Sequence, residues 1–177
     1  MTPIRTILVP TDLSDPADAA WKFAQGLARS LKSRIHLLHV VSTPFLYDAW
    51  GTEGAALRAA EVLGAYEDAA RKELARLVPR RGALRGRVVA ATRTGLAVDQ
   101  ILDYIATHRI DLVVMGTHGR GVVGHLLLGS VAERVVQHSP VPVLTLHGAS
   151  SSAPAGKRRA PSPRPGRGRR RSSSRKR

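Results

Sequence analysis

The chain has 177 residues and a formal net charge of +15, from 28 Lys and Arg against 13 Asp and Glu. It contains no cysteine, which excludes disulfides and thiolate metal sites. The length suits one domain with a sizeable core, and no apolar run approaches the roughly 20 residues of a membrane span. The chain reaches Pro10 and Asp12 before any apolar stretch of signal-peptide length, so we expect a cytoplasmic protein without a membrane segment.

The positive charge is concentrated at one end of the chain. Residues 148–177 hold 11 of the Lys and Arg and no acid, which leaves 17 basic against 13 acidic residues in residues 1–147. The Ser, Pro, Gly and Arg content of this end is typical of chains that do not bury a core. We therefore predict a folded domain over residues 1–147 and a disordered basic tail over residues 148–177.

The chain begins with a strand and a helix. Residues 4–9 (IRTILV) predict a short buried strand, which Pro10 stops. A polar turn follows, and we expect Ser14 or Asp15 to cap the next helix, with Pro16 in its first turn. The apolar side chains of this helix have the spacing of one helical stripe. They are Ala20, Phe23, Ala24, Leu27, Ala28 and Leu31.

Strands and helices then alternate to the end of the predicted domain. The helix that Gly95 opens has Val98, Ile101, Leu102 and Ile105 on one face. Near-continuous apolar strands separated by helices predict an α/β fold with a parallel sheet covered on both faces. The further strands are expected at residues 34–41, 87–92, 111–115 and 141–146, and the other helices at residues 53–77 and 131–138.

The glycine-rich stretch at residues 116–130 (GTHGRGVVGHLLLGS) fits three ligand-binding patterns. Gly119, Gly121 and Gly124 spell the GxGxxG of dinucleotide sites, but that motif needs an acidic residue about 20 positions later. No acid follows Glu133, so this interpretation fails. The segment GHLLLGS resembles a Walker loop without the lysine that neutralises the phosphates, and we set it aside.

The third pattern is Gly-2x-Gly-9x-Gly-Ser, formed by Gly116, Gly119, Gly129 and Ser130. Ser130 and Glu133 have the spacing of an S-x-x-E capping box, which marks the start of a helix. The last glycine of the pattern is therefore expected at a helix N-terminus.

A helix N-terminus binds phosphate without a lysine, because its free N–H groups and the helix dipole attract anions. The N–H groups near Val131 and Ala132 are the expected donors, and Arg120 is the expected cation. Gly116 and Gly119 allow the loop backbone to approach the same phosphates. The alternative is that these glycines only form a turn between a strand and a helix.

Four segments together resemble the universal stress protein family: VPTDLS, LLHV, DLVVMGTHG and PVPVLTL. The resemblance covers residues 1–147 and excludes the tail. It implies a five-stranded parallel sheet of order 3-2-1-4-5, of the Rossmann-like type seen in adenine-nucleotide alpha hydrolases. Strands one and four are then neighbours, and a ligand crevice is expected between their carboxyl ends.

Family members with an intact glycine motif bind ATP, so the resemblance implies ATP, with Mg²⁺ arriving on the nucleotide and no metal site in the protein. It implies adenine and ribose contacts from Pro10, Thr11, Asp12 and Val40. It implies ribose and phosphate contacts from Met115, Gly116, His118, Gly119, Gly129, Ser130, Val131 and Ala132. Asp12 equally fits a turn-capping residue, His118 a solvated loop residue, and His39 a core histidine with one backbone partner.

The resemblance also implies a homodimer paired through the last strand, whose apolar edge favours being covered. ATP hydrolysis needs a base or a water-orienting group near the γ-phosphate, and the loop offers only His118, His125 and Arg120. We therefore assign no catalytic residue. The expected function is a nucleotide-responsive stress or regulatory protein with at most slow ATPase activity.

Two other functions stay open. The tail predicts non-specific binding of nucleic acid or another polyanion, without base stacking because residues 148–177 contain no aromatic side chain. The domain also fits a dimeric interaction module that has lost its nucleotide.

Overall fold

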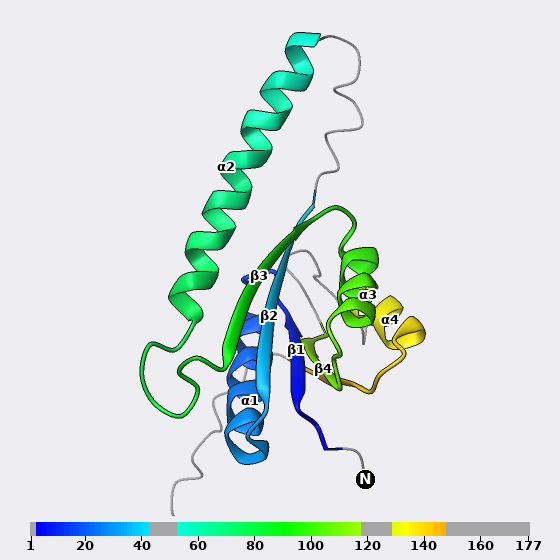
Figure 1. The fold of residues 1–177 in the computed structure, drawn as a ribbon. Helices are drawn as coiled ribbons and strands as arrows, with labels where there is room; N and C mark the ends of the chain where they lie inside the picture. The colour runs from blue at the N-terminus through cyan, green and yellow to red at the C-terminus, as the bar shows by residue number, and fades with distance from the viewer. Residues whose placement is uncertain (1–2, 43–52, 118–128, 148–177) are drawn as a thin grey trace, which may run out of the picture.

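The computed structural model describes residues 3–42, 53–117 and 129–147, so the basic tail lies outside the described residues. Five strands form one sheet in the order β3-β2-β1-β4-β5, and every neighbouring pair is parallel (Figure 1). This arrangement confirms the expected fold. The strands are β1 (Thr6–Pro10), β2 (Arg34–Val41), β3 (Val88–Thr94), β4 (Leu112–Gly116) and β5 (Val143–Leu146). The helices are α1 (Asp15–Leu31), α2 (Glu53–Leu77), α3 (Ala97–Thr107) and α4 (Ser130–His138).

The helices cover both faces of the sheet. α1 and α2 lie on one face, and α3 and α4 on the other (Figure 1). On the first face Trp21 and Leu74 belong to the same buried cluster as Val9 of β1. On the second face Tyr104 belongs to a cluster with Leu8. Because successive side chains of a strand point to opposite faces, β1 contributes to both clusters, which is why its sequence is a continuous apolar run.

The buried face of α1 differs from the expected one. Phe23 and Leu31 are 44% and 45% exposed, whereas Trp21, which we had not placed on the apolar face, is buried. Small side chains on the buried stripe let the helix approach the sheet closely, and the larger residues lie at its flanks. The fully buried alanines of this stripe are Ala20, Ala24 and Ala28.

The turn before α1 is held by Asp12. Ser14 is the N-cap residue, but its side chain makes no cap hydrogen bond, so the expected capping contact is wrong. Its hydroxyl and its amide instead donate to Oδ1 of Asp12, at 2.5 and 3.1 Å. Leu13 has a positive φ of 64° within this turn. The Asp side chain therefore fixes the path of the chain from β1 to α1.

The start of α4 also differs from the sequence expectation by one residue. Gly129 is the N-cap, and no side chain caps the helix, so the predicted capping box of Ser130 and Glu133 does not form. Ser130 is the first residue of the helix and not its N-cap. A capping-box bond is made by the side chain of the N-cap residue, which here is a glycine. The amide of Glu133 donates to the carbonyl of Gly129 at 2.9 Å. The helix still begins next to the last glycine of the pattern, as expected.

Pro10 does not stop the first strand. It is the last residue of β1 and pairs with Leu38 of β2. The next amide, that of Thr11, donates to the Leu38 carbonyl at 2.8 Å, so the ladder continues past the proline. A proline lacks only its own N–H, and at the end of a strand this loss is tolerated.

Candidate functional site

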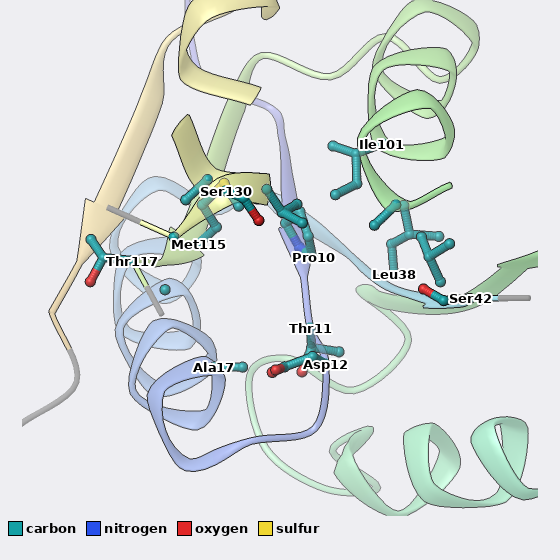
Figure 2. Close-up of a pocket in the computed structure, with 16 residues that line it drawn as sticks. Pro10, Thr11, Asp12, Ala17, Leu38, Ser42, Ile101, Met115, Thr117 and Ser130 are labelled. Carbon is teal, nitrogen blue, oxygen red and sulfur yellow. The ribbon is translucent and has the colours of Figure 1, made fainter. Parts of the chain in front are cut away.

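A cavity of about 470 Å³ opens at the carboxyl ends of β1 and β4 (Figure 2). These strands are neighbours, and the sheet continues from β1 to β2 on one side and from β4 to β5 on the other. Open parallel sheets bind ligands at such a switch in strand order. The volume lies in the range of sites for small molecules and cofactors.

The rim formed by the end of β1 is fixed by hydrogen bonds to β2. The carbonyl of Thr11 accepts a hydrogen bond from Nδ1 of the half-buried His39 at 2.8 Å. The Thr11 hydroxyl accepts a hydrogen bond from the amide of Leu13 at 3.0 Å, within the turn that follows β1. The Thr11 carbonyl is the backbone partner expected for His39 from the sequence. This contact holds Thr11, which lines the cavity, in place.

Asp12 has two structural roles. It lines the cavity (Figure 2), and it orders the turn before α1 through its bonds to Ser14. The structural interpretation of Asp12 as a turn-capping residue is therefore confirmed. The role in the turn is compatible with a ligand contact by the same side chain, because a carboxylate has two oxygens with several lone pairs.

The rim formed by the end of β4 is joined to both β5 and α4. Thr117, which is buried, donates its amide to the carbonyl of Leu146 at 2.9 Å. Its carbonyl accepts the amide of Gly129 at 2.5 Å, and its hydroxyl lies 2.6 Å from Nδ1 of His147. These bonds place the start of α4 beside Gly116, so the first and last glycines of the sequence pattern lie at one cavity.

The first turn of α4 lines the cavity with Ser130, Val131 and Ala132. The first N–H groups of a helix have no carbonyl partner within the helix. They carry the positive end of the helix dipole, so this side of the cavity favours an anion.

Apolar side chains form much of the remaining lining. Leu38 of β2 and Ile101 of α3 lie across the cavity from Ser130, whereas Met115 of β4 lies beside Ser130 (Figure 2). Val40 of β2 and Ala97 of α3 also line the cavity. A slot between aliphatic side chains accommodates a flat, weakly polar ring. The cavity therefore has an apolar end and an end that favours negative charge.

Ten of the thirteen residues that the sequence assigned to the site line this cavity. The other three, His118, Gly119 and Arg120, lie outside the described residues. The ten are Pro10, Thr11, Asp12, Val40, Met115, Gly116, Gly129, Ser130, Val131 and Ala132.

Six lining residues were not expected from the sequence. Ile101 was assigned only to the apolar face of its helix, and helical spacing alone does not distinguish a core side chain from one that ends at a cavity. Thr117 stands between two expected site residues, so its position was the available signal. The six are Ala17, Leu38, Ser42, Ala97, Ile101 and Thr117.

The described lining residues include no Lys or Arg, and Asp12 is their one carboxylate. In the part of the chain that the structure describes, no three His, Cys, Asp or Glu side chains are grouped to hold a metal ion. The described donors available to an anion in this cavity are therefore backbone N–H groups and the hydroxyls of Ser and Thr side chains.

The sheet order and the cavity between β1 and β4 define a Rossmann-like α/β protein. Residues 3–147 match the Universal stress protein family, and the chain belongs to this family. Within the described residues, no helix is both long and apolar enough to cross a membrane.

Sequence relatives support this assignment, and solved structures share the fold. A universal stress protein of Thermus aquaticus is 32% identical over 79% of this chain and 96% of its own length. Universal stress protein MJ0531 of Methanocaldococcus jannaschii is 29% identical over 80% of this chain and 81% of its own length. The structure of UspA from Lactobacillus plantarum has a TM-score of 0.67 and 28% identity, over 82% of this chain and 99% of its own. A family member from Arabidopsis thaliana, solved with AMP bound, shares the fold at 20% identity, with a TM-score of 0.55 over 86% and 97%.

Proposed function

We propose that the protein binds ATP in the cavity between β1 and β4 and acts as a nucleotide-responsive regulatory protein. The observation that carries the proposal is that one cavity combines an aliphatic slot with the N-terminus of α4. An adenine nucleotide has the same two parts, a flat base and a chain of phosphates.

The phosphates are assigned to the end of the cavity formed by Gly116 and the first turn of α4. Hydrogen bonds to charged groups contribute about 1.5 to 3 kcal/mol each. Three or four of them contribute roughly 4.5 to 12 kcal/mol before the costs of association. Micromolar binding, which corresponds to about −8 kcal/mol, therefore also requires burial of the base in the aliphatic slot. Residues His118, Gly119 and Arg120 are proposed to close over the phosphates, and Mg²⁺ to arrive with the nucleotide.

The adenine is assigned to the slot between Val40, Ile101 and Met115, and the ribose to the rim at Asp12. A carboxylate is a suitable acceptor for ribose hydroxyls. The family member solved with AMP bound shows that this fold accommodates an adenine nucleotide in another protein.

Hydrolysis is proposed to be slow at most. A general base must lie within hydrogen-bond reach of the attacking water. Among the described lining residues Asp12 is the one acid–base side chain, and it lies at the ribose end of the proposed pose. The bound nucleotide then serves as a ligand that biases conformation, and no catalytic residue is assigned.

Calorimetric titration of the purified protein with ATP, AMP and adenosine, in the presence of Mg²⁺, tests the proposal directly. We expect micromolar binding of ATP and weaker binding of adenosine, because adenosine lacks the phosphates that α4 attracts. Absence of heat with all three ligands, together with no nucleotide released when the purified protein is denatured, would contradict ATP binding.

We also propose that two copies associate through β5. This strand forms one edge of the sheet, with β4 as its neighbour, and its Leu144 is 37% exposed. An apolar strand edge of this kind favours a partner strand. The short length of β5, four residues, leaves room for further contacts from α4, where Val136 is exposed as well.

A second candidate function is non-specific polyanion binding through residues 148–177, supported by their 11 Lys and Arg without an acid. Such binding falls steeply with salt, by roughly 10³ to 10⁵ for six to ten phosphate contacts between low and moderate salt. A chain ending at residue 147 should lose binding to a double-stranded DNA probe but keep its ATP affinity. Equal DNA binding by both chains would remove this candidate.

A further inference from the structure

A group of ionisable side chains lies between α3 and the strands β2 and β3, and none of its members lines the cavity. It consists of His36 from β2, Arg93 from β3, and Tyr104 and His108 at the C-terminal end of α3. We refer to these four residues as the His–Tyr cluster. Tyr104, only 2% exposed, is at its centre.

Tyr104 contacts each of the other three side chains. Its hydroxyl lies 2.9 Å from Nδ1 of His36, and the two rings meet edge to face. The ring of His108 stacks on it in parallel, with 3.8 Å between centroids. The guanidinium carbon of Arg93 lies 5.4 Å from the Tyr104 centroid, within the range of a cation–π contact.

The position of His108 is fixed by the end of its helix. Its Nδ1 lies 3.2 Å from the carbonyl of Tyr104 and 2.8 Å from the hydroxyl of Thr107, which itself donates to the carbonyl of Asp103. This pattern assigns the neutral imidazole its proton on Nδ1.

The surroundings of His36 disfavour a positive charge. Burial lowers the pKa of His36 below its ordinary value of 6.5, and His108 and Arg34 lower it further. Burial also raises the pKa of Tyr104 above 10.0, with Arg93 acting in the opposite direction, so the hydroxyl stays protonated near neutral pH.

No carboxylate on the elements packed against His36 is among the causes that shift its pKa, and Asp99 at the start of α3 is exposed. β1 places Leu8 beside His36, and β3 places Val89 beside it and Arg93 further along the strand. α3 contributes Tyr104 and His108. Its C-terminal half also carries Asp103, which is exposed.

We propose that the His–Tyr cluster is an acid-sensitive contact: protonation of His36 beside His108 and Arg34 loosens the C-terminal half of α3 from β2 and β3. The hydrogen bond between His36 and Tyr104 joins two segments that are 68 residues apart in the chain. The same helix carries Ile101 into the cavity, one turn before Tyr104. Loosening of α3 therefore changes the apolar wall of the cavity, and this second step rests on the proposed function.

The direction of the pH effect follows from proton linkage. The folded protein holds the pKa of His36 below 6.5, so the unfolded chain binds more protons as the pH falls through that value. Stability is fully present above pH 6.5 and decreases toward the lower pKa of the folded state. For one proton, the unfolding constant rises by at most about tenfold per pH unit.

Urea unfolding of the full chain between pH 8 and pH 5, without nucleotide, tests the proposal. In H36Q the side chain takes up no proton, so we expect a flatter pH dependence than in the unaltered protein. H138Q is the control, because it removes a histidine of α4 that lies outside the cluster, where Nδ1 of His138 is 2.9 Å from the carbonyl of Arg134. Its pH dependence should equal that of the unaltered protein.

Two results would overturn the proposal: the same pH dependence in H36Q as in the unaltered chain, or an NMR titration in which His36 protonates at or above pH 6.5. If H36Q is too unstable to purify, the NMR titration of the unaltered protein decides alone.

The link to the cavity is tested with adenosine, whose charge does not change between pH 7.5 and 5.5. We expect its dissociation constant to increase several-fold at the lower pH in the unaltered protein and to stay constant in H36Q. A dissociation constant that is the same at both pH values in the unaltered protein and in H36Q would contradict the link between the cluster and the cavity. The acid-sensitive contact itself would then be decided by the urea unfolding data. No adenosine or ATP binding at either pH would instead contradict the proposed function.

Discussion

The amide of Gly129 donates a hydrogen bond to the carbonyl of Thr117 at 2.5 Å. Thr117 directly follows β4, and Gly129 directly precedes α4. This one bond joins the end of a central strand to the start of a helix, across residues 118–128. The backbone donors at the start of α4 are therefore placed by the sheet, which gives the proposed phosphate site a rigid support.

Replacing Ser130 with proline should weaken ATP binding without unfolding α4. Proline is favoured at the first position of a helix, and the preceding Gly129 already has the extended conformation that proline requires, with φ −71° and ψ 152°. The substitution removes one N–H from the cavity. We expect the ATP dissociation constant to rise at least tenfold, from the loss of about 1.5 kcal/mol or more, in calorimetric titration.

The control for this prediction is Ser130→Ala, which keeps the N–H and removes the hydroxyl. Its ATP affinity should stay close to that of the unaltered protein, and both variants should bind adenosine normally. An equal loss in Ser130→Ala would assign the effect to the side chain and contradict phosphate binding by the backbone.

Asp111 should stabilise the fold at the amino end of β1, at the other end of the strands from the cavity. Its Oδ2 accepts the amides of Arg5 and Thr6, both at 2.8 Å, at the start of β1. Asp111→Ala leaves these two donors without the carboxylate, and we expect a loss of about 2 kcal/mol in the free energy of unfolding. Urea denaturation measures it. Asp103→Ala is the control, because only the backbone carbonyl of this exposed residue accepts a bond from Thr107.

ATP affinity should be unchanged in Asp111→Ala at temperatures where the variant is folded, since the site lies at the carboxyl ends of the strands. A change in unfolding free energy below about 0.5 kcal/mol, the usual range for surface substitutions, would show that these two bonds contribute little.

Leu144→Lys should separate the proposed dimer. The substitution places a charge on the exposed side of the edge strand β5, where a partner strand would bury it, and charged edges oppose strand pairing. We expect light scattering after size exclusion to report a dimer for the unaltered chain and a monomer for this variant. Phe23→Lys, at an exposed apolar residue on α1, should remain dimeric. Monomers in all three samples would contradict association through β5.

The local pattern of the sequence determined the elements and their alternation. The bounds of α2, Glu53–Leu77, agree with the expected helix at both ends. The apolar runs that form β1 and β4 predicted strands of a parallel sheet covered on both faces. These features depend on side-chain spacing along a short stretch of chain, so they are readable without knowledge of distant partners. The strand order came with the family resemblance, and the described sheet confirms it.

Only the tertiary structure decided which side chains meet. Helical spacing predicted that Phe23 faces the sheet, but Phe23 is exposed and close packing of the alanine stripe buries Trp21. The same spacing did not reveal that Ile101 reaches the cavity. His36 and Tyr104 lie 68 residues apart, and their contact exists because the register of β2 and the packing of α3 bring them together. Such contacts depend on distances between elements, and the periodicity of a single element contains no information about those distances.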